Sequence, residues 1–314
     1  MLNDAIINAV ADLLACPKCK NMLSLEHDEL TCVSCGTTYE TYNGETINFL
    51  EGPPPNDSAY EIIKSNGEDP AFRINNFYVP FLRKLVAKRH LEPGKLRVLD
   101  SGCGAGGAVE ILRSEGYDCW GIDLGSRRKL WSDLRYSSNL LVADGTSLPF
   151  KDSSFDLVFS FGVIEHVGVS GDIGYSMSPS PECNSIRKSF IAENIRVLRP
   201  GGIFFLAHPN GAFPIDFWHG GGRNARLHIP YEGFLPSMKD IKKYCNNIDQ
   251  NLILEPISPL NHLSFERISS YWYGRVFKRV MLAFFALMAV RPFTVLSRSP
   301  INPFLVIKIA KPPA

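Results

Sequence analysis

The sequence predicts an α/β fold, in which a mostly parallel sheet of seven strands carries helices on both faces. Residues 97–123 have the pattern of a strand, a glycine-rich turn, a helix and a second strand, which is one right-handed βαβ unit. Helical segments and short apolar runs then alternate along the chain. The runs that we expect to be strands three to seven are 140–143, 155–161, 203–207, 252–257 and 304–310.

Four cysteines in the first fifty residues form two closely spaced pairs. Two residues separate Cys16 from Cys19 and Cys32 from Cys35, and twelve residues separate the pairs. This spacing lets all four thiolates reach one tetrahedral zinc ion, which would stabilise a segment too small to fold on its own core. The sequence therefore predicts a zinc ribbon at 1–50. Disulfide bonds are the alternative, which the absence of a secretory signal disfavours.

The net charge of +1 is unevenly distributed. Residues 1–50 hold two basic and seven acidic residues, whereas residues 267–314 hold eight basic residues and no acidic one. An acidic ribbon argues against contacts with nucleic-acid phosphates, so we expect it to be structural or to bind a partner. The first twenty residues lack the features of a secretory signal, and no apolar run has the roughly eighteen residues of a membrane-spanning helix. These features predict a cytoplasmic protein.

Residues 51–68, which include three consecutive prolines, predict a linker. From 69 to 91 apolar residues recur at helical spacing, and we expect this helix to pack on the first edge of the sheet.

The glycine turn follows, with Gly102, Gly104 and Gly107 in the spacing of a dinucleotide site and Asp123 where a ribose-binding acid would lie. Asp100, however, turns a carboxylate toward the ligand, which excludes a bare pyrophosphate.

Further motifs follow in a fixed order. Asp144 comes directly after the third predicted strand, a Phe-Asp-Leu-Val motif begins the fourth, and residues 196–202 contain Leu-Arg-Pro-Gly-Gly. At these residues, over about 97–210, the sequence resembles the class I S-adenosylmethionine-dependent methyltransferases of the small-molecule group. The resemblance implies a Rossmann-like sheet whose seventh strand inserts antiparallel beside the sixth.

The resemblance also implies a site for S-adenosylmethionine. Backbone N–H groups of the turn would bind the methionine carboxylate, Asp100 the ammonium group, Asp123 the ribose hydroxyls and Asp144 the adenine amino group. The implied cofactor-binding residues are Asp100, Gly102, Gly104, Gly106, Asp123, Leu124, Asp144, Gly145 and Phe161. The alternative is that Asp123 and Asp144 only cap the helix or turn that follows each of them.

The ribbon resembles small zinc-ribbon proteins that activate RNA and protein methyltransferases, through its Leu-Leu-Ala-Cys-Pro entry and its Tyr-Asn-Gly-Glu-Thr-Ile exit. Some rRNA methyltransferases also begin with a ribbon that binds RNA. An RNA methyltransferase is therefore one alternative function. A non-enzymatic scaffold with a vestigial cofactor site is another, and the intact glycines and three acids argue against it.

Three histidines are the candidate general bases, because imidazole titrates near neutrality. His166 follows the fourth strand. It would either take the proton of the acceptor or only shape the cofactor pocket. His219 and His228 lie in a loop at 208–231, rich in glycine and aromatic residues, at the carboxyl end of the fifth strand. The alternative is a structural loop with satisfied histidines. The spacing of His219 and His228 matches no metal triad, so the sequence predicts no catalytic metal.

Residues 168–184, rich in Gly, Ser and Pro, predict a lid.

An insertion at 264–296 separates the last two strands. Basic residues at 275–279 precede eleven apolar residues, 280–290, and Arg291 follows them. Eleven residues do not span a bilayer, and basic flanks suit an interfacial helix. The sequence predicts that 275–296 contacts a membrane or a lipid-linked substrate. A helix buried over the active site and a dimer contact are the alternatives.

The domain organisation that follows is a ribbon (1–50), a linker (51–68) and a methyltransferase domain (69–314). The predicted reaction is in-line methyl transfer to a small-molecule, sugar or lipid-linked glycan acceptor, with a hydroxyl as the favoured nucleophile. The histidine-rich loop favours it, as does a resemblance to methyltransferases of surface-polysaccharide pathways. Positioning in a dry pocket, with one histidine taking the proton, would supply the catalysis.

Overall fold

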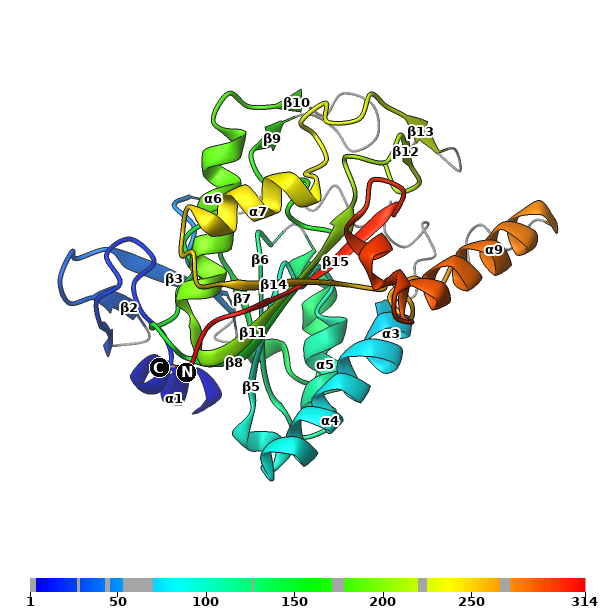
Figure 1. The fold of residues 1–314 in the computed structure, drawn as a ribbon. Coiled ribbons are helices and arrows are strands. Elements are labelled where there is room, and N and C mark those ends of the chain that lie inside the picture. The colour runs from blue at the N-terminus through cyan, green and yellow to red at the C-terminus, as the bar shows by residue number, and fades with distance from the viewer. Residues whose placement is uncertain are drawn as a thin grey trace.

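The computed structural model describes residues 4–26, 29–42, 46–52, 70–125, 127–170, 178–219, 225–265 and 272–313. One large sheet crosses the molecule with helices on both of its faces, which confirms the predicted α/β class (Figure 1). The predicted linker and parts of the predicted lid, the histidine loop and the insertion lie outside the described residues. None of the helices in the described ranges has the length and hydropathy needed to cross a membrane.

The predicted strands form the middle and one margin of this sheet, in the order β7-β6-β5-β8-β11-β15-β14. β15 is antiparallel to both of its neighbours, as the family resemblance implied, and the neighbouring pairs from β7 to β11 are parallel. The bounds are β5 (Arg97–Ser101), β6 (Asp118–Asp123), β7 (Leu140–Val142), β8 (Phe155–Phe161), β11 (Leu198–Pro209), β14 (Ile253–Ile257) and β15 (Phe304–Ala310).

The cysteine-bearing segment continues the same sheet. β4 pairs in parallel with β7 through Asn48 and Val142, and the Phe49 N–H donates to the Val142 carbonyl oxygen at 2.8 Å. Four strands therefore join the seven that the sequence predicted, because the open edge of β7 finds hydrogen-bond partners in β4. The elements of this segment are α1 (Asp4–Asp12), β1 (Leu23–Glu26), β2 (Glu29–Cys32), β3 (Thr38–Tyr42) and β4 (Thr46–Asn48).

One face of the sheet is covered by the helical segment that the sequence predicted at 69–91. It is continuous but contains a π-helical turn, so that α3 (Pro70–Arg73), η1 (Ile74–Tyr78) and α4 (Val79–Arg89) follow one another. The Tyr78 ring stacks on that of Phe159 in β8, with centroids 3.8 Å apart. The segment thus packs on the central strands and not on an edge as expected, since the edge at β7 is already taken by β4. α5 (Gly107–Ser114) lies on the same face.

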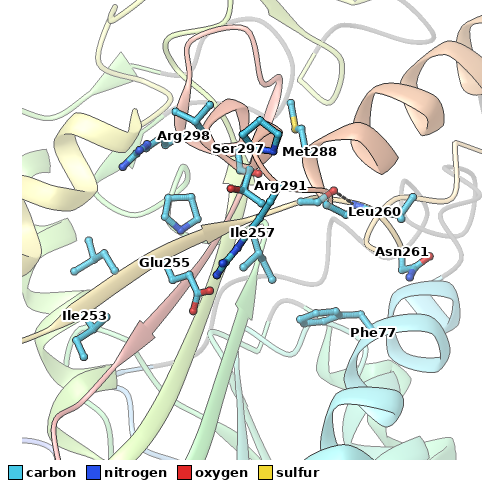
Figure 2. A pocket seen from close by; sticks show the side chains of 17 residues that line it. Phe77, Ile253, Glu255, Ile257, Leu260, Asn261, Met288, Arg291, Ser297 and Arg298 are labelled. Atoms are coloured by element: carbon cyan, nitrogen blue, oxygen red, sulfur yellow. Dashed lines mark hydrogen bonds between the residues drawn. The ribbon is translucent and has the colours of Figure 1, made fainter.

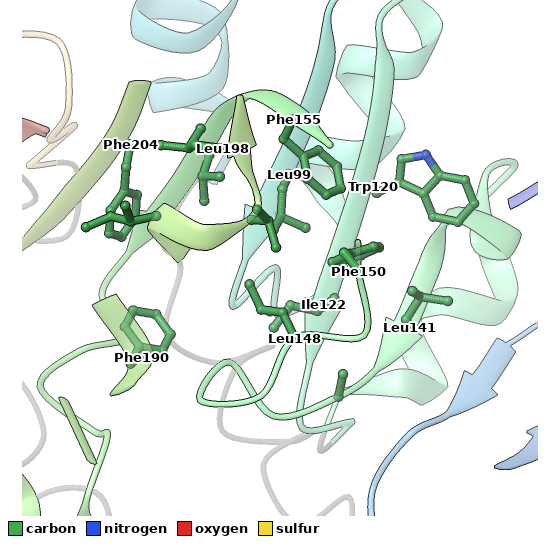
Figure 3. Packing of buried hydrophobic residues seen from close by; sticks show 14 of the residues in the cluster. Leu99, Trp120, Ile122, Leu141, Leu148, Phe150, Phe155, Phe190, Leu198 and Phe204 are labelled. Atoms are coloured by element: carbon green, nitrogen blue, oxygen red, sulfur yellow. The ribbon is translucent and has the colours of Figure 1, made fainter. Parts of the chain in front are cut away.

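The other face holds α6 (Cys183–Arg196) and α7 (Met238–Asn246). Leu99, Trp120, Phe155 and Phe204 of the strands belong there to one hydrophobic cluster with Phe190 of α6 (Figure 3). Buried side chains of the N-terminal segment, among them Leu13, Leu14 and Tyr39, belong to the same cluster. The cysteine-bearing segment and the sheet therefore share one hydrophobic core.

The remaining elements are short or peripheral. The segment after β6 contains a 3₁₀ helix, η3 (Arg128–Asp133). Trp131 is buried there and its Nε1–H donates to the Gly104 carbonyl at 2.8 Å, which holds this segment on the glycine turn. α9 (Trp272–Met288) projects from the body of the molecule (Figure 1). The others are η2 (Pro93–Lys95), η4 (Ser137–Asn139), β9 (Val169–Ser170), β10 (Ser178–Pro179), β12 (Ile215–Asp216), β13 (Arg226–Leu227) and η5 (Phe293–Arg298).

Candidate cofactor and acceptor site

Three predicted acids lie at the carboxyl ends of three adjacent strands. Asp100 lies in β5 opposite Gly121 of β6, and Asp123 ends β6 opposite Val142 of β7. Asp144 follows β7 by two residues. This is the edge of a parallel sheet at which ligands of open α/β folds bind.

The glycine turn between β5 and α5 requires its glycines. Gly102, Gly104 and Gly106 have φ values of 89°, 55° and 80°, which L side chains rarely adopt. A Cβ on Gly102 would also lie 2.2 Å from Cγ2 of Val163. The Asp123 carboxylate accepts the Gly104 N–H at 2.9 Å, so this acid ties the turn to the end of β6.

A cation and a buried acid share the space beside this turn. Burial raises the pKa of Asp100 to about 7, with Arg73 opposing and Asp123 reinforcing the shift. The Arg73 guanidinium lies 3.4 Å from the centroid of the Phe161 ring. Within the described parts of the chain, its Nη1 atom is buried and has no hydrogen-bond partner. Arg73 was missed in the sequence, where one arginine in a helix carries no signal of a site.

Asp144 is exposed and begins a loop that contacts the cysteine-bearing segment. Its Oδ1 accepts the Thr146 N–H at 2.8 Å, the turn-capping interaction expected as the alternative role. Lys20 Nζ donates to Ser147 Oγ and to the Leu148 carbonyl, both at 3.2 Å. A Cβ on Gly145 would lie 2.5 Å from the Phe190 ring, so this loop packs closely on α6.

A second cluster lies beyond the ends of β8 and β12. His219 Nε2 is 3.4 Å from His166 Nε2 and 4.0 Å from Glu165 Oε1. Asp216 Oδ2 is 2.9 Å from His219 Nδ1, and Asp216 Oδ1 accepts two backbone N–H groups. Because a carboxylate only accepts, Nδ1 of His219 carries the hydrogen and its ring orientation is fixed. Glu165 and Asp216 were not predicted as site residues.

The charges of this cluster are strongly coupled. Burial lowers the pKa of His219, but the hydrogen bond and charge of Asp216 outweigh it and raise that pKa above its usual value. Burial raises the pKa of Glu165 to about 7. His166 is open to solvent at one edge, while the surrounding protein and the neighbouring His219 lower its pKa to about 4. His166 is therefore a neutral imidazole at neutral pH.

A buried arginine of α6 positions this cluster. Arg187 is 1 % exposed, and its guanidinium donates to backbone carbonyls on both segments that flank the site. The acceptors are the carbonyl oxygens of Ile164, Glu165, Val167, Gly233 and Phe234. In the sequence, Arg187 looks like one residue of a solvated helix face, so its role could not be found there.

The structure does not group His228 with His166 and His219. Its Nδ1 instead lies 3.7 Å from Glu232 Oε1. Leu124 directly follows Asp123 and is 47% exposed.

The four N-terminal cysteines come together as the spacing predicted. All four sulfurs lie within 4.8 Å of one another, with Cys16 to Cys35 at 3.7 Å and Cys19 to Cys32 at 3.4 Å. The turns that carry the two cysteine pairs have the same backbone hydrogen bond. The N–H of Lys20 donates to the carbonyl of Cys16, and the N–H of Gly36 donates to the carbonyl of Cys32. Thiolates of a tetrahedral zinc site lie about 3.8 Å apart, so the separations fit this donor set.

Residues 99–206 match the protein family described as "Methyltransferase domain". The match covers about a third of the chain. It includes the glycine turn, the acids Asp100, Asp123 and Asp144, and Glu165 with His166. It ends before the loop that carries His219.

Curated relatives match about half of the chain. Norajmaline N-methyltransferase of Rauvolfia serpentina is 32% identical over 163 residues, which are 48% of this chain and 44% of the relative. The 2-methyl-6-phytyl-1,4-hydroquinone methyltransferase of Synechocystis is 31% identical over 174 residues, which are 52% and 48% of the two chains. The chain thus spans less than half the length of either relative.

Among solved structures, the CcbJ methyltransferase of Streptomyces caelestis matches with a TM-score of 0.47 and 14% identity, over 82% of this chain and 97% of that one.

Proposed function

We propose that the protein transfers a methyl group from S-adenosylmethionine to a small-molecule acceptor. The observation that carries this proposal is the placement of Asp100, Asp123 and Asp144 at three adjacent strand ends around the glycine turn. The family match over the same residues supports it. Both curated relatives are named for small organic acceptors.

The residues present fit the proposed cofactor. Asp100 and Arg73 form a buried acid and a cation with a free N–H, and together they complement the ammonium and carboxylate groups of a methionine moiety. Asp123 has carboxylate oxygens for ribose hydroxyls in addition to the backbone N–H groups that it accepts. Asp144 is exposed after β7, on the side where adenine would extend. When bound, the cofactor supplies an electrophilic methyl group on a sulfonium.

We propose an acceptor hydroxyl on a sugar or lipid-linked glycan, with the histidine cluster at its nucleophile. Asp216 orients His219, and the neutral His166 faces both His219 and solvent. This arrangement lets His166 take a proton from an acceptor and pass it toward His219. His228, which lies with Glu232, would then contribute to the loop and not to proton transfer.

We propose that the four cysteines bind a structural zinc ion. The sulfur separations fit a tetrahedral zinc site. The Tyr39 hydroxyl lies 3.0 Å from Cys16 Sγ, where it would donate a hydrogen bond to a ligating thiolate. The knuckle at 16–20 contacts the loop that begins with Asp144, through Lys20 and through the hydrogen bond from Ser147 Oγ to the Pro17 carbonyl. The ion would thus support the adenine side of the cofactor site.

We further propose that α9 contacts a membrane surface that presents the acceptor. Val276, Val280 and Leu287 lie at helical spacing in α9 and Val290 follows its end, and each of the four is 41–60% exposed. Phe285 and Met288, on the other side of the helix, are buried against the body. Exposed Arg275, Arg279 and Arg291 flank the apolar stripe. This combination is typical of an interfacial helix and disfavours a fully buried one.

A cavity of about 910 Å³ lies beside this helix, between β14 and the segment 288–298 (Figure 2). Its walls combine apolar side chains, including Met288 and Ile257, with the guanidinium groups of Arg291 and Arg298. Apolar walls with positive charge suit a lipid with an anionic head group.

Two measurements test the proposal. Isothermal calorimetry with S-adenosylhomocysteine is expected to show binding that is lost in an Asp100→Ala, Asp123→Ala double variant. Absence of binding by the intact protein would refute the cofactor assignment.

Vesicle pelleting tests the membrane contact. The intact protein is expected to pellet with phosphatidylglycerol vesicles and less with phosphatidylcholine vesicles. Val280→Glu should abolish pelleting, whereas Val33→Glu, at an equally exposed valine of the cysteine-bearing segment, should leave it unchanged. Equal pelleting of both variants would contradict a role for α9.

A further inference from the structure

We propose that Glu165, His166 and His219 bind a divalent transition-metal ion on the acceptor side of the site. One ligand atom from each residue lies within 4.8 Å of the other two. Nitrogen ligands of a tetrahedral zinc ion lie about 3.3 Å apart, and the two Nε2 atoms are 3.4 Å apart. Glu165 Oε1, at 4.0 Å from His219 Nε2, is within about 1 Å of such a separation.

The orientation of His219 is that of a metal ligand. Asp216 accepts the Nδ1 hydrogen, which leaves Nε2 as the atom turned toward His166 and Glu165. Histidines that bind metals commonly donate their second ring N–H to a carboxylate in this way. Asp216 is itself fully buried and held by the N–H groups of Trp218 and His219, so the ring is fixed before any ion arrives.

The carboxylate of Glu165 supplies an independent observation. Glu165 is 2 % exposed, and in the described ranges its Oε2 atom has no hydrogen-bond partner. Arg187 donates to the backbone oxygen of Glu165 and not to its carboxylate. A buried carboxylate oxygen without a donor is costly, and a cation held by both oxygens of the Glu165 carboxylate would satisfy Oε2.

Three protein ligands leave coordination positions open for an acceptor, and His166 is the ligand exposed to solvent. Here the inference rests on the proposed function. With the ion bound, Nε2 of His166 and of His219 would be ligands and would no longer act as bases. An acceptor hydroxyl bound to the ion would instead lose its proton to solvent water more readily. Its oxygen would then form a bond to the methyl carbon as the carbon–sulfur bond breaks, giving a methyl ether and S-adenosylhomocysteine.

This site was not predicted from the sequence, because the spacing of a metal triad was considered only for His219 and His228. His166 and Glu165 lie 53 and 54 residues before His219, on a different strand end. The structure brings them together through the two segments that Arg187 joins.

Cobalt binding tests the site. The intact protein is first saturated with zinc at its cysteines and then titrated with Co²⁺. We expect a further equivalent to bind with the visible spectrum of nitrogen and oxygen ligation and without thiolate charge-transfer bands. His166→Ala and His219→Ala should remove this equivalent, and Asp216→Asn should weaken it by about 10- to 100-fold. His228→Ala, in the same loop, should retain it.

The controls separate this inference from folding and from the proposed function. Protein prepared with Co²⁺ alone should show thiolate charge-transfer bands in every variant, which reports that the chain is folded. Binding of S-adenosylhomocysteine is measured on the same samples, so failure of the cofactor site is seen separately. Absence of the further equivalent in the intact protein, or its retention in both His166→Ala and His219→Ala, would overturn the inference.

Discussion

Replacing Lys20 with methionine tests whether the cysteine-bearing segment supports the cofactor site. Lys20 ends the first cysteine knuckle, and its Nζ donates to Ser147 Oγ, to the Leu148 carbonyl and, at 2.8 Å, to Glu193 Oε2. These three contacts join the knuckle to the loop after Asp144 and to α6. Methionine keeps the length of the side chain and removes the charge and all three hydrogen bonds.

The expected loss in the free energy of unfolding follows from the solvent exposure and the remaining partners of Lys20 and Glu193. The Lys20 side chain is 31% exposed and that of Glu193 15%, so solvent screens the ion pair only in part. Glu193 keeps Arg196 and the Leu148 N–H as partners, and no buried charge is left alone. We therefore expect a loss of about 1–2 kcal/mol in the free energy of unfolding. If about 1 kcal/mol of this loss reaches the Asp144 loop, cofactor affinity falls about fivefold.

Lys18→Met is the matched control. Lys18 lies in the same knuckle, and its ion pair with Glu51 is 3.7 Å long with side chains 61% and 83% exposed. Exposed pairs of this kind contribute about 0–0.5 kcal/mol. Urea unfolding and calorimetry with S-adenosylhomocysteine are measured for both zinc-loaded variants. Equal stability and affinity in the two variants would show that the knuckle does not support the loop.

Three further predictions concern the site itself. Asp123→Ala removes the acceptor of the Gly104 N–H and the proposed ribose contact, and should weaken S-adenosylhomocysteine binding by about 1–3 kcal/mol; Asp118→Ala, at the other end of β6, should not. Because burial raises the pKa of Asp100 to about 7, its carboxylate forms as pH rises, and S-adenosylmethionine binding should tighten about tenfold from pH 6 to pH 8. A flat profile, or the same profile in Asp100→Asn, would assign the change to another group. Arg187→Met leaves several carbonyls unpaired and should cost about 3 kcal/mol or more in urea unfolding. Lys188→Met, at the next residue of α6, serves as its control, and an equal loss would contradict the positioning role.

The strands could be predicted because each is a continuous apolar run. β8 and β15 have the predicted bounds, and the other predicted strands differ by a few residues at their ends. The acids at the strand ends were found for the same reason, since a polar residue after an apolar run marks where a strand ends. The order of the motifs then indicated the family whose description residues 99–206 match.

What escaped prediction depends on contacts between distant residues. The pairing of β4 with β7 rests on Asn48 and Val142, and neither residue marks a sheet edge in the sequence. Arg73 and Arg187 look like ordinary helical arginines until the fold places Asp100 beside one and backbone carbonyls around the other. Asp216 acquires its role only when the loop folds back so that its carboxylate meets His219.

The pairing of β4 with β7 also changes which strand forms one margin of the sheet. With β7 paired on both sides, this margin ends in β1, a strand of four residues. A short terminal strand is a poor template for recruiting another chain, whereas a bare β7 would offer an open ladder of N–H and carbonyl groups. The cysteine-bearing segment thus covers a strand at which two copies of the chain would otherwise be able to pair.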